Sequence, residues 1–130
     1  MCLLDEVLQW DPRSIRCASS THRSPDNPLR AHGRLGAACG VEYAAQAMAV
    51  HGALLAPSGS APVTVGYLGS LRAIALHVAR LDQIEAKLIA TAERLNGDSR
   101  IALYRFTLHG GERLLLSGRA TVVHPEPSAE

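Results

Sequence analysis

The sequence has no large excess of positive or negative charge, and its cysteines are not spaced as in a disulfide framework. Lysine and arginine total 13 and aspartate and glutamate total 12, which gives a formal net charge of +1. A charge this close to zero creates no field that would gather nucleic acid or an anionic membrane, so we expect neither as a partner. The three cysteines, Cys2, Cys17 and Cys39, are odd in number and widely spaced. This fits neither a disulfide framework nor a zinc site and favours a reducing compartment.

We expect no export signal, and the sequence has no uninterrupted hydrophobic span. Asp5 and Glu6 stand where a secretory signal would carry basic residues followed by an apolar run. The apolar stretch 36–56 is interrupted by Glu42 and His51, and ionisable groups are costly in lipid. We therefore expect a cytoplasmic protein that does not enter the membrane.

A chain of 130 residues is sized for a single domain, 1–130, with one site. The segment 23–36 is dense in proline, asparagine, aspartate, glycine and arginine, which favours a loop. The alanine-rich sequence that follows predicts one long helix over about 36–55, apolar almost all round and therefore buried on most faces. Proline, glycine and serine in 56–62 end this helix, and the tail 125–130 is expected to be flexible.

The rest of the chain predicts strands, two short ones within 1–10 and 14–22 and four more between 63 and 124. Turn sequences at 96–98 and 109–111 connect the last of them. One strand has an alternating apolar face, formed by Ala102, Tyr104, Phe106 and Leu108. We predict an α+β fold in which an antiparallel sheet of about six strands wraps around the helix. Because one helix cannot cover a whole sheet and strand edges need partners, a dimer is expected.

Glu42 is the most informative residue, because it is the only ionisable side chain between Arg34 and His51 and lies near the start of a helix built for burial. Burial and the helix dipole act in opposite directions on a carboxyl group there, which together could poise it for proton transfer. Gln46 lies one turn further along on the same face and could hold that carboxyl or a substrate group. The open alternative is a helix-start acid satisfied by backbone amides or an arginine.

Two histidines are candidates for a general base opposite such a carboxylate: His22 ends the second predicted strand, and His32 lies in the loop before the helix. His51 is assigned to packing. Backbone N–H groups at the helix start, at Gly40 and Val41, are suited to accept a carbonyl oxygen as negative charge builds on it. Close packing explains the small residues there equally well. No metal-ligand pair occurs at helical spacing, so we expect no metal and no cofactor.

The helix sequence resembles that of a known family. "GVEYAAQAMAVHGAL" is similar to the central helix of the hotdog-fold beta-hydroxyacyl-acyl-carrier-protein dehydratases, in which a Glu is followed by a Gln four residues later, as Glu42 is by Gln46. The resemblance is closer to the dehydratase-like branch found in bacterial aryl-polyene and xanthomonadin-type pigment clusters. Counterparts occur in the same order for "MCLLDEV", "NPLR", "EYAAQAMA" and "GYLGSLRAIALHV", so the resemblance covers nearly the whole chain.

This resemblance implies a hotdog fold and dehydration of a 3-hydroxyacyl thioester, on acyl carrier protein or coenzyme A, to the trans-2-enoyl form in fatty-acid-like, polyene or polyketide biosynthesis. It also implies a homodimer, a higher oligomer of dimers or a heterodimer with another hotdog protein, with clefts between subunits. Glu42 takes the position of the acid that protonates the departing hydroxyl, and a histidine of the other subunit would remove the alpha proton. The family's H-F-P-G segment is absent. His32, followed by Gly33, lies in the corresponding loop, and His22 is the competing candidate.

Two other functions fit the same residues. In a hotdog thioesterase, Glu42 would activate water for hydrolysis of the thioester instead of protonating a leaving hydroxyl. In a non-catalytic subunit, the chain would stabilise a catalytic hotdog partner or a ketosynthase complex, which the missing H-F-P-G segment makes reasonable.

Overall fold

The computed structural model of the chain describes residues 2–56, 67–98 and 100–123, and the statements below concern these ranges. In chain order the elements are β1 (Glu6–Trp10), β2 (Ser14–Ser19), the 3-10 turns η1 (Thr21–Arg23) and η2 (Ala37–Cys39), α1 (Gly40–Leu55), β3 (Tyr67–Leu76), β4 (Leu88–Gly97), β5 (Ile101–Gly110) and β6 (Arg113–Val123). The prediction of six strands and one long helix is confirmed. The predicted flexible tail and nearly all of the predicted helix-ending segment 56–62 lie outside the described residues.

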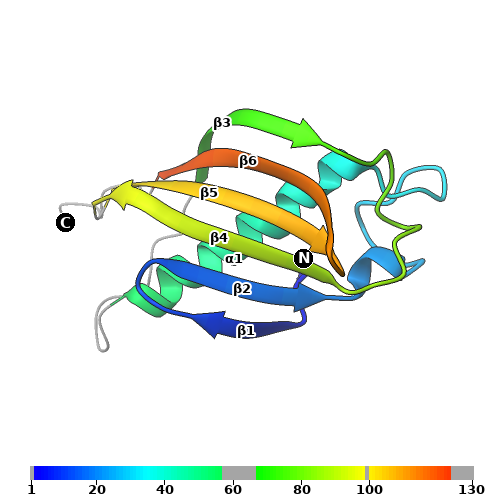
Figure 1. Cartoon of the computed structure of the whole chain (residues 1–130), viewed down its shortest axis with the longest axis horizontal. Coiled ribbons are helices and arrows are strands. Elements are labelled where there is room, and N and C mark those ends of the chain that lie inside the picture. The colour runs from blue at the N-terminus through cyan, green and yellow to red at the C-terminus, as the bar shows by residue number, and fades with distance from the viewer. Residues whose placement is uncertain (1, 57–66, 99, 124–130) are drawn as a thin grey trace, which may run out of the picture.

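The six strands form one antiparallel sheet in the order β1-β2-β4-β5-β6-β3. The sheet curves around α1, which crosses one of its faces diagonally (Figure 1). This order leaves β1 and β3 at the edges, each with a single neighbouring strand. The β3 strand is ten residues long and exposes four large apolar side chains, Leu68, Leu71, Ile74 and Leu76. A long apolar edge strand is an unsatisfied surface that another chain can cover.

The core lies between α1 and the concave face of the sheet. The alternating face predicted for β5 is confirmed, because all four of its residues are buried: Ala102, Tyr104, Phe106 and Leu108. The helix meets them with residues at helical spacing, Tyr43, Ala44, Ala47, Met48 and His51. The alternating face of β5 and the buried face of α1 therefore pack against each other in one layer.

The helix differs from the prediction in two ways. It begins at Gly40 instead of about residue 36, because 37–39 form a tighter 3-10 turn. We expected the helix to be buried on most of its faces. One face, which carries Glu42, Ala49 and Ala53, is exposed in the single chain. The sheet of a single chain covers only one side of a helix, which explains this difference. No helix within the described ranges is both long enough and apolar enough to span a membrane.

His51 ties the end of α1 to the sheet. Its Nε2 atom lies 2.8 Å from the Asp11 carbonyl oxygen and its Nδ1 atom lies 2.7 Å from the Tyr104 hydroxyl oxygen. Because a carbonyl oxygen only accepts, Nε2 donates to Asp11; in this tautomer Nδ1 accepts from the Tyr104 hydroxyl. The helix is thereby fixed to the β1–β2 hairpin and to β5, which agrees with a packing role for this histidine.

Tyr104→Phe should lower the free energy of unfolding by about 1–3 kcal/mol, because it leaves a buried nitrogen of His51 without its donor. Urea denaturation followed by circular dichroism measures this difference, and the denaturant slope should not change. A stability equal to that of the wild type would show that water or another group replaces the Tyr104 hydroxyl.

Candidate active site

The start of α1 is held by the chain that follows β3. Leu35 donates its N–H to Asp82 Oδ1 over 3.0 Å, and its carbonyl oxygen accepts from the Leu81 N–H over 2.8 Å. The Ala37 N–H donates to the Ala79 carbonyl oxygen over 3.0 Å. These bonds fix the loop immediately before the helix, so the first turn of α1 has a defined position.

Asp82 connects this loop to an ion pair with Arg80. The hydrogen bond from Arg80, together with that from the Leu35 amide and against the opposing effect of burial, holds the pKa of the Asp82 carboxyl well below its ordinary value of 3.8. A depressed pKa in the folded state means that the carboxylate stabilises the fold above the unfolded pKa and that this stabilisation is lost as the pH falls.

Asp82→Asn should therefore lower the free energy of unfolding at pH 7, and its difference from the wild type should shrink below about pH 4 as Asp82 becomes protonated in the unfolded chain. Urea titrations at pH 7, 5 and 3 measure this convergence. Asp26→Asn, which changes an exposed carboxyl in the 23–36 loop, is the matched control. A deficit of equal size at all three pH values would contradict the assignment.

Gly40 is buried where the helix meets the sheet. A side chain at this position would collide with Leu116 and would come within 2.9 Å of Leu108. Its N–H, which we expected to be free for a carbonyl oxygen, donates to the carbonyl oxygens of Ala37 and Ala38. The structure therefore gives Gly40 a packing role, and Val41 beside it is half-buried. Substrate binding by these two residues stays a prediction.

Glu42 lies in the first turn of α1 and is exposed. Within the described ranges its carboxylate has no hydrogen bond or ion pair, which argues against an acid satisfied by backbone amides or by an arginine. Gln46, one turn further along, is half-buried and its Oε1 atom accepts from the Leu3 N–H over 2.8 Å. Gln46 thus anchors the N-terminal segment, and its predicted contact with Glu42 or substrate stays a prediction.

Tyr43, next to Glu42, is buried and takes part in a network of side-chain hydrogen bonds that was not predicted from the sequence. Thr21 Oγ1 donates to the Leu3 carbonyl oxygen over 2.7 Å, so at the 2.8 Å contact between hydroxyls it is Tyr43 that donates to Thr21. Asn27 Nδ2 in turn donates to the Tyr43 hydroxyl over 3.0 Å. This hydrogen-bond network holds the 23–36 loop and the N-terminal segment against the first turns of α1.

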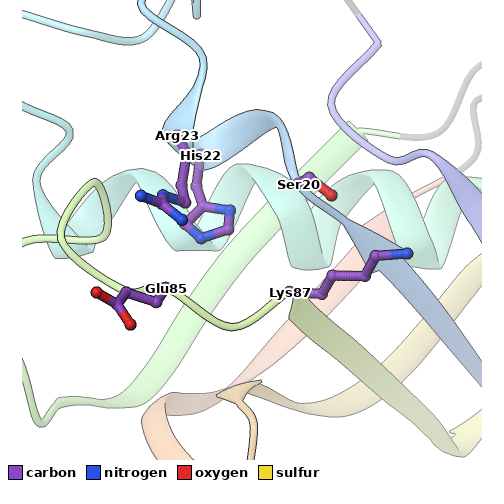
Figure 2. Close-up of a pocket in the computed structure, with 5 residues that line it drawn as sticks. All are labelled: Ser20, His22, Arg23, Glu85 and Lys87. Carbon is purple, nitrogen blue, oxygen red and sulfur yellow. The ribbon is translucent and has the colours of Figure 1, made fainter.

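His22, one of the two candidate bases, lies in η1 directly after β2 and is fully buried. Its Nε2 atom is 2.8 Å from the Ile84 carbonyl oxygen. Burial lowers the pKa of His22 below its ordinary value of 6.5, against the raising effect of the backbone carbonyls of Ile84 and Ala86. The ring lines a pocket of about 370 Å³ with Ser20, Arg23, Glu85 and Lys87 (Figure 2).

His32, the other candidate, is exposed at the tip of a tight turn. The turn is closed by reciprocal backbone bonds of 2.9 and 3.0 Å between Ala31 and Arg34. His32 and Gly33 both have positive φ, 53° and 74°, a conformation that suits glycine and asparagine better than most residues. The histidine therefore projects from the loop that precedes the helix.

The structure does not bring the candidate acid and the candidate bases together within one chain. No hydrogen bond between Glu42 and either His22 or His32 is found among the described residues. Sequence reasoning did not find the pocket beside His22, because Ser20 and Lys87 are far apart along the chain and meet only through the pairing of β2 with β4. In the part of the chain that is described, no three His, Cys, Asp or Glu side chains could hold a metal ion.

A family model described as ApeP-like, ApeP dehydratase, matches residues 1–130. The chain belongs to the ApeP-like dehydratase family. This agrees with the resemblance carried by Glu42, Gln46 and the segments around them. No curated protein sequence is similar enough to this ApeP-like chain to count as a relative.

Solved structures give the same fold for this ApeP-like chain. The dehydratase heterocomplex ApeI:P from Xenorhabdus doucetiae matches with a TM-score of 0.87 and 21% identity, over 98% of this chain and 85% of that chain. A thioesterase from Haemophilus influenzae matches with a TM-score of 0.65 and 15% identity, over 96% and 82%. A thioesterase family protein from Silicibacter pomeroyi gives 0.65 and 15%, over 91% and 82%. The fold is the hotdog fold, as predicted.

Proposed function

We propose that this chain is a subunit of a dehydratase that converts a 3-hydroxyacyl thioester to the trans-2-enoyl thioester, with Glu42 as the acid that protonates the departing hydroxyl. The carrier would be acyl carrier protein, with coenzyme A as the alternative, in polyene or fatty-acid-like biosynthesis in the cytoplasm. Family membership supports the reaction class. The observation that carries the assignment is that the single carboxylate of α1 points away from its own sheet and has no partner within the described ranges.

The site is completed by a second hotdog subunit, which forms a cleft over Glu42. Two features of the chain support this. The exposed face of α1 is apolar apart from Glu42, with Ala49 and Ala53 further along the same face. The β3 strand exposes large apolar side chains, and within the described ranges only β6 pairs with it. A protein with the same fold is described as a heterocomplex. A cleft at this boundary would desolvate Glu42 and make proton transfer from it effective.

The base is a histidine of the other subunit. Of the two candidates in this chain, His32 is the one a second subunit can reach, because it is exposed at the tip of a projecting turn, whereas His22 is enclosed and bonded to Ile84. In a homodimer, His32 of one copy would face Glu42 of the other. In a heterodimer, the partner would supply a histidine of its own.

Purified protein incubated with 3-hydroxyacyl- and enoyl-thioesters on acyl carrier protein tests the proposal, alone and mixed with hotdog proteins encoded beside it. Interconversion of the two thioesters is the expected result. Release of free acid would show a thioesterase instead. Absence of any reaction in every combination would leave only a non-catalytic subunit and would contradict the proposal.

His32→Asn should lower the rate of a homodimeric dehydratase about 10²- to 10⁴-fold, the usual contribution of general acid–base catalysis. Asparagine accepts positive φ, so the turn is preserved. His109→Asn, whose side chain lies on the face of β5 opposite to the buried Leu108, is the matched control and should keep the wild-type rate. If His32→Asn keeps that rate as well, the base belongs to a different protein or a different residue.

A further inference from the structure

The segment 27–30, with the sequence Asn-Pro-Leu-Arg, carries part of the family resemblance but has no role in the reaction as proposed so far. Its first residue, Asn27, is buried. The Asn27 Nδ2 atom donates to the Thr21 carbonyl oxygen over 2.9 Å and to the Tyr43 hydroxyl over 3.0 Å. Because Tyr43 is the neighbour of Glu42 in α1, Asn27 fixes the loop before the helix next to the proposed acid.

Arg30, the last residue of this segment, is half-buried and bridges two parts of the loop. Its Nε atom donates to the Ser24 carbonyl oxygen over 2.8 Å, and its Nη1 atom donates to the Gly33 carbonyl oxygen over 3.0 Å. Its Nη2 atom makes a longer contact of 3.4 Å with the His22 carbonyl oxygen. All of these acceptors are backbone carbonyls. One guanidinium therefore joins the chain that precedes it to the turn that follows it.

The turn after Arg30 needs such support, because His32 and Gly33 have φ values of 53° and 74°. A positive φ is unfavourable for a residue with a side chain and persists only where the surrounding contacts impose it. Two kinds of contact do this among the described residues: the reciprocal backbone bonds between Ala31 and Arg34, and the bond from Arg30. Of the two, only the bond from Arg30 connects the turn to the preceding part of the loop.

We propose that Arg30 is a positioning residue, which holds the His32 turn at a fixed place relative to the first turn of α1. This role rests on the proposed function, in which His32 of one copy faces Glu42 of the other. Proton transfer requires both groups within hydrogen-bond distance of the reacting atoms, and a displacement of about 1 Å can lower the rate about 10²-fold. A guanidinium suits the role, because its N–H donors form a rigid planar fork that can bind carbonyls on two sides.

Amide hydrogen exchange of the full chain, measured by nuclear magnetic resonance, tests the placement of the turn without any turnover. In Arg30→Met the Ala31 and Arg34 amides, which close the turn, should exchange about tenfold faster or more, the scale of a lost hydrogen bond to a charged group. The Leu81 amide, which donates to the Leu35 carbonyl oxygen, should keep its protection and show that the fold is intact. Unchanged exchange of the turn amides would contradict the proposal.

A double-mutant cycle tests whether Arg30 acts through His32. In the complete hotdog assembly, Arg30→Met should lower kcat about 10- to 100-fold while KM stays close to the wild-type value. In the His32→Asn background the same change should have no further effect, because no base is left to position. A merely structural loss would lower kcat by the same factor in both backgrounds and would overturn the proposal.

Arg34→Met is the matched control, because it removes the same charge from an exposed side chain of the same turn. It should keep the wild-type kcat and the wild-type exchange rates. Arg30→Lys keeps the charge without the planar fork of donors and should recover only part of kcat. Equal losses in Arg34→Met and Arg30→Met, or a wild-type kcat in Arg30→Lys, would show that charge matters and the bridging contacts do not. Either result would overturn the proposal.

The two experiments separate an error about Arg30 from an error in the proposed function. If His32→Asn lowers kcat while Arg30→Met changes neither kcat nor the exchange of the turn amides, the role of Arg30 is refuted and the base assignment stands. If the turn amides exchange faster in Arg30→Met while His32→Asn keeps the wild-type rate, Arg30 does hold the turn and the base assignment is refuted.

Discussion

Glu42→Gln should lower kcat of the dehydration about 10²- to 10⁴-fold while KM stays close to the wild-type value. The amide has nearly the same shape as the carboxyl group but cannot deliver a proton to the departing hydroxyl. Because Glu42 is exposed and has no partner within the described ranges, the free energy of unfolding should stay within about 0.5 kcal/mol of the wild-type value. Steady-state kinetics with the complete hotdog assembly and a urea titration of the variant measure both quantities.

Glu112→Gln is the matched control for this experiment. Glu112 is an exposed carboxyl in the turn between β5 and β6, so its loss removes the same charge outside the proposed cleft. Hydration of the enoyl thioester, the reverse reaction, should decline in parallel for Glu42→Gln, because one transition state serves both directions. Dehydration at the wild-type rate would show that Glu42 is not the acid.

The fold was predictable from the sequence because its elements follow short-range patterns. Alternation in β5 placed Tyr104 and Phe106 in the core, and the alanine-rich run placed the helix to within four residues at its start. That start was missed because η2 continues the same composition with a tighter turn, and composition alone does not separate the two helix types. The exposed face of α1 was missed for a different reason, since burial depends on what else covers the helix.

The candidate site was only partly predictable. Sequence reasoning proposes Glu42 because a carboxyl group is conspicuous in an apolar helix; the structure shows that it is exposed, and its role as the acid stays a prediction. The role of Gln46 as an anchor for Leu3, and the pocket around His22, depend on contacts between residues more than 40 positions apart. No local pattern records such contacts, because they arise from the strand order, which places β2 beside β4.

Gly40→Val should lower the free energy of unfolding by about 1–3 kcal/mol, the usual cost of forcing extra methyl groups into a packed core. The new side chain would meet Leu116 and Leu108, both fully buried and surrounded by other core residues. Gly36→Val is the matched control, because an added Cβ meets nothing within 4 Å there and the backbone is extended, with φ −67° and ψ 153°. Since Gly40 also sets the height of the first turn of α1 above the sheet, Gly40→Val should displace Glu42 and reduce kcat even under conditions in which the variant is fully folded. Urea denaturation and steady-state kinetics of the two variants separate these effects. Equal stability of Gly40→Val and Gly36→Val would show that the leucines can move aside and that Gly40 is not needed for the close contact between helix and sheet.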